Sequence, residues 1–125
     1  MKRIIFTEKA PKPVGPYSQG VEINSTLYIA GQVPIDPETG KMAEGGVREQ
    51  TAQVMTNIGA ILEAAGYSFA DLVKTTCLLS DMADFGAMNE VYGSFFTEEP
   101  PARVTFAAKQ LPRGALVEIE AVAAK

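Results

Sequence analysis

Histidine and tryptophan are absent from this 125-residue chain, and cysteine occurs once, at Cys77. Without histidine the sequence lacks the most common metal ligand and the usual general base near neutral pH, so Ser/His/Asp and Cys/His catalytic arrangements are excluded. A lone cysteine forms neither an internal disulfide nor a thiolate metal cluster. We therefore expect no histidine- or thiolate-bound metal, a reducing cytoplasmic location, and acid–base chemistry carried by Glu, Asp, Lys, Tyr or water.

Positive charge is also scarce, because 11 Lys and Arg stand against 15 Asp and Glu and give a net charge of −4. Nucleic-acid binding depends on clustered cations that displace counterions from phosphates, and no such cluster occurs along the chain. No apolar run approaches the roughly 20 residues that span a bilayer. Glu8 and Lys9 end the first apolar stretch too early for a secretion signal. The sequence thus argues against nucleic-acid, membrane and secreted classes.

The composition that is present, 46% hydrophobic and 21% charged, is that of one ordinary folded domain. We expect a single domain over residues 1–125. Period-two apolar patterns predict strands, and apolar spacing of three and four predicts helices. The predicted strands are 3–7, 21–23, 27–30, 72–79, 103–108 and 116–123. The predicted helices are 47–65, with Gly66 after its end, and a second that Asp81 or Asp84 opens and Pro100-Pro101 ends.

This order predicts an α+β fold in which two amphipathic helices lie on one face of a single mixed β-sheet. Strands such as 27–30 and 76–79 carry apolar side chains on both sides, yet the chain has no third layer to cover the second face. We infer that other subunits cover it.

Arg103 is the first candidate for chemistry, since it follows Pro100-Pro101 and opens an apolar strand. A guanidinium there suits bidentate capture of a small carboxylate. The alternative is a surface arginine paired with Glu98 or Glu99, as most charges solvate a protein face.

Glu118 and Glu120 share one face of the last strand, because side chains alternate along a strand. Partial burial at a subunit interface would raise the pKa of one of them and suit it to proton transfer. The alternative is an exposed strand face with two solvated carboxylates.

Three further positions have both a functional and a structural interpretation. Tyr17 sits between turn residues, where it can offer its ring to a ligand or pack on the edge of the core. Gly31 can offer an unhindered N–H to an anion or simply form a turn or bulge. Asn89, a poor helix former, either reaches a polar partner or points to solvent.

Cys77, without a cationic or histidine neighbour in sequence, is interpreted as a small buried hydrophobe.

Six segments of the sequence occur together and in order. They are Ala10-Pro11 with Gly15-Pro16-Tyr17-Ser18-Gln19-Gly20, Ile29-Ala30-Gly31-Gln32-Val33-Pro34, Glu63-Ala64-Ala65-Gly66, Val73-Lys74-Thr75-Thr76, Pro101-Ala102-Arg103, and Val117-Glu118-Ile119-Glu120-Ala121. Over residues 4–123 the chain resembles the RidA/YjgF family of reactive-intermediate (enamine/imine) deaminases. The resemblance implies a chorismate-mutase-like fold and a homotrimer, with the sheets as an inner barrel, the helices outside and ligand clefts between subunits.

The resemblance also implies roles for individual residues. Arg103 would grip a substrate carboxylate, the Gly31 N–H and the Tyr17 ring would complete the pocket, Asn89 would line the same cleft, and Glu118 would position the hydrolytic water. Glu120 has no implied catalytic role.

The chain departs from the family pattern at two positions. Thr105, expected to line the pocket, stands where many members have Cys, and Ala30 stands where some have Ser. Neither is the carboxylate clamp, so these differences bear on substrate preference more than on activity.

The implied reaction is hydrolysis of 2-iminopropanoate and 2-iminobutanoate to 2-keto acids and ammonia, without a cofactor. Two alternatives stay open on the same fold. One is a different small carboxylate, bound or deaminated; the other is a regulatory, chaperone-like or ribonuclease-type translation-inhibitor role, although the acidic balance disfavours direct RNA binding.

Overall fold

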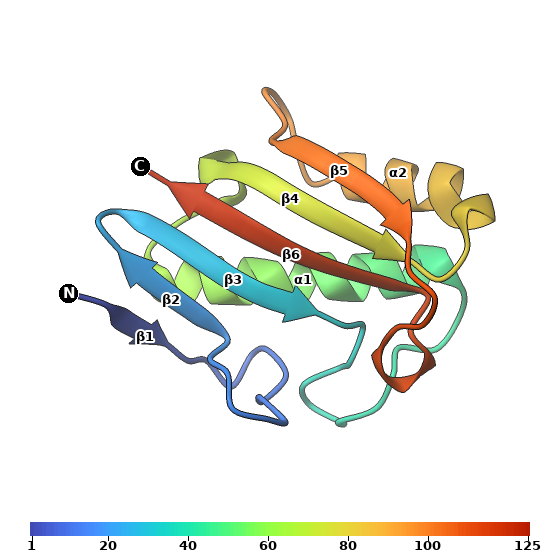
Figure 1. The fold of residues 1–125 in the computed structure, drawn as a ribbon, viewed down its shortest axis with the longest axis horizontal. Coiled ribbons are helices and arrows are strands. Elements are labelled where there is room, and N and C mark those ends of the chain that lie inside the picture. Colours follow the sequence, from blue (N-terminus) through green and yellow to red (C-terminus); the bar gives the residue numbers. More distant parts are fainter.

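The computed structural model describes all residues 1–125 and contains six strands and two α-helices in one sheet-and-helix unit (Figure 1). The strands are β1 (Arg3–Ile5), β2 (Gly20–Ile23), β3 (Thr26–Gln32), β4 (Leu72–Leu79), β5 (Ala102–Ala107) and β6 (Val117–Ala124), and the helices are α1 (Val47–Ala65) and α2 (Phe85–Gly93). Every predicted element is present, and most boundaries agree within two residues. The α+β fold class is confirmed.

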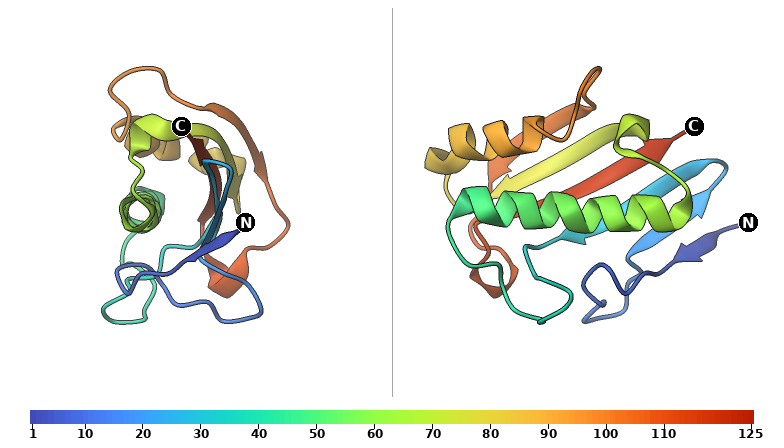
Figure 2. Two further views of the ribbon diagram at one scale, coloured as in Figure 1. Left: turned by 90° about the vertical axis from the view of Figure 1, so that its left-hand side faces the viewer. Right: turned by 180° about the vertical axis from the view of Figure 1, so that it is seen from behind.

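The strands form one mixed sheet in the order β1-β2-β3-β6-β4-β5. All neighbours are antiparallel except β4 and β5, which run parallel because α2 crosses over between them. Both helices lie on the same face of the sheet, as the views from the end and from behind show (Figure 2). β5 is therefore an edge strand that runs along α2.

Helix α1 supplies most of the core because its apolar residues recur on one face. Its buried side chains, among them Val54, Ile58 and Ile61, pack on the inward residues of β3 and β6. Glu49 accepts a hydrogen bond from the Gly46 N–H, 2.8 Å away, at the helix start. Gly66 adopts φ 86° directly after the helix, where a left-handed residue favours glycine.

The second face of the sheet, called the open face below, has no covering layer. Inward-facing Val117, Ile119, Ala121 and Ala123 of β6 are buried, whereas the alternate residues point away from the helices. Large apolar side chains remain exposed there: Tyr28 is 51%, Val104 45% and Phe106 48% exposed. An uncovered apolar surface of this kind marks an interaction face.

Helix α2 is shorter than predicted, since it ends at Gly93 and not at Pro100-Pro101. The Ser94 hydroxyl donates to the Val91 carbonyl over 2.6 Å, which satisfies an end carbonyl of the helix. Beyond it, Phe95 and Phe96 contact the Phe69 ring at centroid distances of 5.4 and 6.1 Å. Aromatic packing thus redirects the chain several residues before the prolines. Neither α-helix has the length and apolar composition needed to cross a membrane.

Replacement of Ile61 by Ala should lower the free energy of unfolding by about 2–4 kcal/mol, because Ile61 is fully buried and the truncation leaves a cavity. Urea denaturation at one fixed chain concentration measures the change. The control Glu63→Ala, at an exposed position of the same helix, should stay within about 0.5 kcal/mol of the parent. Equal effects of the two substitutions would contradict this packing of α1.

Candidate functional site

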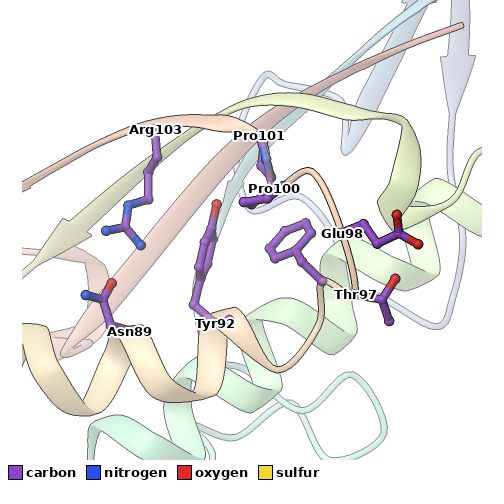
Figure 3. Close-up of a pocket in the computed structure, with 9 residues that line it drawn as sticks. Asn89, Tyr92, Thr97, Glu98, Pro100, Pro101 and Arg103 are labelled. Atoms are coloured by element: carbon purple, nitrogen blue, oxygen red, sulfur yellow. The ribbon is translucent and has the colours of Figure 1, made fainter.

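Arg103 lies on the edge strand β5 with its guanidinium directed toward α2 (Figure 3). Its Cζ atom lies 5.0 Å from the ring centroid of Tyr92 and 5.5 Å from that of Phe85. The ion pairs of the chain join Arg3 to Glu22 and Arg48 to Glu90, so neither Glu98 nor Glu99 pairs with Arg103. The surface ion-pair alternative is therefore wrong, and the cation is left without an acidic partner.

A cavity of about 470 Å³, the Arg103 cavity, opens beside this guanidinium. Asn89 and Tyr92 of α2 line one side, and Pro100 and Pro101 line the other (Figure 3). The two prolines fix the backbone as it enters β5, which holds the start of the strand and hence Arg103 in place. Arg103 and Asn89 give this cavity a charged and a polar lining group beside the Tyr92 and Phe96 rings, so the cavity suits a small charged ligand.

Two polar atoms next to Arg103 are buried without any hydrogen-bond partner: Oδ1 of Asn89 and Oγ1 of Thr105. Buried polar groups are usually paired, so unpaired ones near a cation indicate a missing partner. Asn89 lines the Arg103 cavity, as expected. Thr105 does not line either of the two principal cavities of the single chain, although it shares the helix-facing side of β5 with Arg103.

Cys77 lies beside Thr105 on the neighbouring strand β4, and the two residues are paired in register. Burial raises the pKa of the Cys77 thiol to about 11, although the Arg103 charge opposes the shift. The thiol is therefore protonated at neutral pH and unsuited to nucleophilic attack. The interpretation of Cys77 as a buried small hydrophobe is confirmed.

A second cavity, of about 380 Å³, holds the other predicted site residues and is called the Glu118 cavity. Tyr17, Gly31 and Glu118 all line it. The Tyr17 hydroxyl accepts a hydrogen bond from the Val14 N–H over 3.3 Å, so the proline-rich loop fixes a ring that is 48% exposed. Of the two interpretations of Tyr17, this exposure favours a ring that is available to a ligand over one packed on the edge of the core.

Gly31 lies in a bulge of the β3–β6 pairing, between the register pairs Ile29–Ala121 and Gln32–Ile119. Bulges re-aim backbone groups and are common beside functional sites. A Cβ atom at Gly31 would collide with the Glu118 carboxylate, so only glycine permits the two residues to approach so closely. The bulge thus places a backbone segment directly against a carboxylate.

Partial burial raises the pKa of Glu118 above that of an ordinary glutamate, and the like charge of Glu120 on the same strand face raises it further. The sequence predicted this direction for one carboxylate of the pair, and the structure assigns it to Glu118. A carboxyl group with a raised pKa exchanges protons more readily near neutral pH.

Lys12 and Arg113 also line the Glu118 cavity, and sequence analysis did not single them out. Both lie in loops, Lys12 among the N-terminal prolines and Arg113 in the Pro112–Gly114 turn, where φ of Arg113 is 57°. The only sequence signal for these two residues was a basic side chain between turn-forming residues. Their positions beside Glu118 depend on tertiary contacts that no local pattern reveals.

The two halves of the predicted site lie on opposite faces of the sheet. Arg103 is paired in register with buried Thr75, so it faces the helices, whereas Glu118 is paired with Leu78 on the open face. The sheet itself separates the two side chains within one chain. Arg103 and Glu118 can meet on one small ligand only when a second copy brings its own half to the cleft.

The model of the family described as Endoribonuclease L-PSP matches residues 7–125. This chain belongs to the RidA/YjgF family. A RutC family protein of Pyrococcus horikoshii is 56% identical over 100% of this chain and 99% of its own length. The 2-iminobutanoate/2-iminopropanoate deaminase of Mus musculus is 50% identical over 98% of this chain and 91% of its length.

The crystal structure of RidA from a Psychrobacter species superimposes with a TM-score of 0.95, at 45% identity over 98% of this chain and 99% of that one. The fold is thus that of RidA proteins, in agreement with the sequence-based prediction. The residues that match the family model include lining residues of both cavities, namely Tyr17, Gly31, Arg103 and Glu118.

The carboxyl carbon of Glu118 should titrate in ¹³C NMR with a midpoint above the roughly 4.3 of an ordinary glutamate, so its protonated form persists to higher pH. In Glu120→Gln the midpoint should fall, because the like charge is removed. Glu63→Gln, on the helix side of the sheet, serves as the matched control and should leave it unchanged. A Glu118 midpoint at or below the ordinary value would contradict the assigned burial.

Proposed function

We propose that the protein hydrolyses 2-iminopropanoate and 2-iminobutanoate, in their imine or enamine forms, to 2-keto acids and ammonia. The proposal depends on one observation: Arg103 is a partly buried cation that lines a cavity and has no acidic partner. Such a group lacks its counter-charge, and a small carboxylate supplies it in bidentate form. The name of the 50% identical mouse relative supports the same substrate class.

The proposed active site lies between subunits of a homotrimer. Arg103 and Asn89 come from one chain, and Tyr17, Gly31 and Glu118 come from its neighbour. The exposed apolar side chains of the open face support this assembly, because a neighbouring sheet would remove them from water. In the trimer Thr105 also reaches the cleft, where the ligand or the neighbour satisfies its hydroxyl.

Hydrolysis of an imine requires only positioning and proton transfer. Glu118 accepts a proton from water as the water oxygen forms a bond to the imine carbon and the C=N electron pair moves to nitrogen. That nitrogen takes up a proton, giving a carbinolamine. A second proton transfer to nitrogen and loss of the hydroxyl proton break the C–N bond, releasing ammonia and the 2-keto acid. The raised pKa of Glu118 suits both transfers.

Ribonuclease activity is the second candidate function, because the matched family model is described as an endoribonuclease. The net charge of −4 and the absence of histidine weigh against it. Incubation of the same protein preparation with single-stranded RNA tests this alternative beside the imine assay. A regulatory protein that binds a small carboxylate without turning it over would fail both assays.

Arg103→Ala should abolish accelerated hydrolysis of 2-iminobutanoate generated in situ by a threonine dehydratase, followed as 2-oxobutanoate release. Loss of the guanidinium removes the carboxylate clamp, which costs at least about 100-fold in kcat/KM. Arg48→Ala is the matched control, since Arg48 lies on α1, pairs with exposed Glu90 and lines neither cavity. Unchanged turnover in Arg103→Ala, with the oligomer intact, would refute the proposed site.

A further inference from the structure

We infer that the ring of Tyr92, locked by Thr75, positions the Arg103 guanidinium in place of the usual acidic partner. Thr75, Tyr92 and Arg103 come from three neighbouring elements, β4, α2 and β5. The inference deepens the proposed function, because it rests on Arg103 as the group that binds the substrate carboxylate.

An arginine that must bind a carboxylate has to be held without losing its donors or its charge. An acidic partner would occupy the N–H groups and cancel the charge before any substrate arrived. An aromatic face attracts the cation through the ring quadrupole and leaves the N–H edges free. The Arg103 Cζ lies 5.0 Å from the Tyr92 centroid and 5.5 Å from the Phe85 centroid, within the range of such contacts.

The Tyr92 ring is itself held by a buried hydrogen bond. Its hydroxyl lies 2.7 Å from the Thr75 hydroxyl, and the two residues are 5% and 1% exposed. Burial raises the pKa of the Tyr92 phenol, so the ring stays neutral. Breaking this bond would leave a buried hydroxyl unpaired, which fixes the ring in one orientation.

Thr75 is also the register partner of Arg103 on the adjacent parallel strand. Thr75 therefore positions the backbone of Arg103 through strand pairing. Its hydroxyl also holds the Tyr92 ring beside the Arg103 guanidinium. The Phe96 ring, 5.0 Å from Tyr92, packs on the same tyrosine and limits its movement. Figure 3 shows the Tyr92 ring beside the Arg103 side chain, and both residues line the Arg103 cavity.

Substitutions at position 92 separate the ring from its hydroxyl. Tyr92→Leu removes the aromatic face and should raise both KM for 2-iminobutanoate and Kd for the product 2-oxobutanoate about 5- to 30-fold, with kcat changed less than about twofold. The split arises because the carboxylate is bound equally in ground and transition states. Tyr92→Phe keeps the face and should recover most of the affinity. Thr75→Val should lie between the two.

Tyr67→Leu is the matched control for general destabilisation. Tyr67 is 6% exposed, its hydroxyl donates to Glu22 over 2.7 Å, and its ring lies 4.7 Å from the Lys125 ammonium, all remote from both cavities. This variant should lose stability and keep KM and Kd. A Tyr92→Leu variant with the parent's KM and Kd, or one affected no more than Tyr67→Leu, would overturn the inference.

A measurement without ligand keeps the inference separable from the proposed function. The NMR order parameter of the Arg103 Nε–H bond should fall in Tyr92→Leu and stay near the parent value in Tyr92→Phe, whether or not the protein turns over imines. Absence of hydrolysis with a ring-dependent order parameter would refute the proposed function and support the inference. An order parameter unchanged by Tyr92→Leu would refute the inference even in an active enzyme.

Discussion

The alternation of side chains along β-strands is the constraint on which the rest of the structure depends. Two helices cover one face of the sheet, and the register of β4 with its neighbours places Arg103 on that face and Glu118 on the other. The proposed function needs both groups on one small ligand, and within a single chain the sheet lies between them. A second copy of the chain would cover the apolar side chains left exposed on the open face, and it would also complete the proposed site.

Electrostatics of the two halves are complementary for a carboxylate that carries a reactive imine. Arg103 keeps its charge because aromatic rings, and no acid, lie against its guanidinium. Glu118 is pushed toward its protonated form by burial and by Glu120. In the proposed site one side therefore attracts the anion and the other exchanges protons. The bulge at Gly31, where a Cβ atom would meet the Glu118 carboxylate, brings backbone next to that second group.

Much of the fold follows from local pattern. The apolar period of α1, the left-handed Gly66 after it and the alternation in β6 fixed those elements almost to the residue. The end of α2 was misplaced because proline marks where a helix cannot continue, whereas the rings of Phe95 and Phe96 ended it earlier. Strand order and the separation of Arg103 from Glu118 depend on long-range register. Tyr92 lies with Met88 on the buried face of α2, and no periodicity distinguishes a core ring from one that packs against an arginine.

Mixed assembly tests the central claim, that each site is shared between chains, most directly. Arg103→Ala and Glu118→Gln chains, each inactive alone, are unfolded together, refolded in equal amounts and assayed for imine hydrolysis. In a random trimer about one quarter of clefts pair an intact Arg103 with an intact Glu118, so about one quarter of the parent rate should return. A mixture no more active than the two variants assayed separately would show that the two residues do not meet across an interface, and would contradict the account.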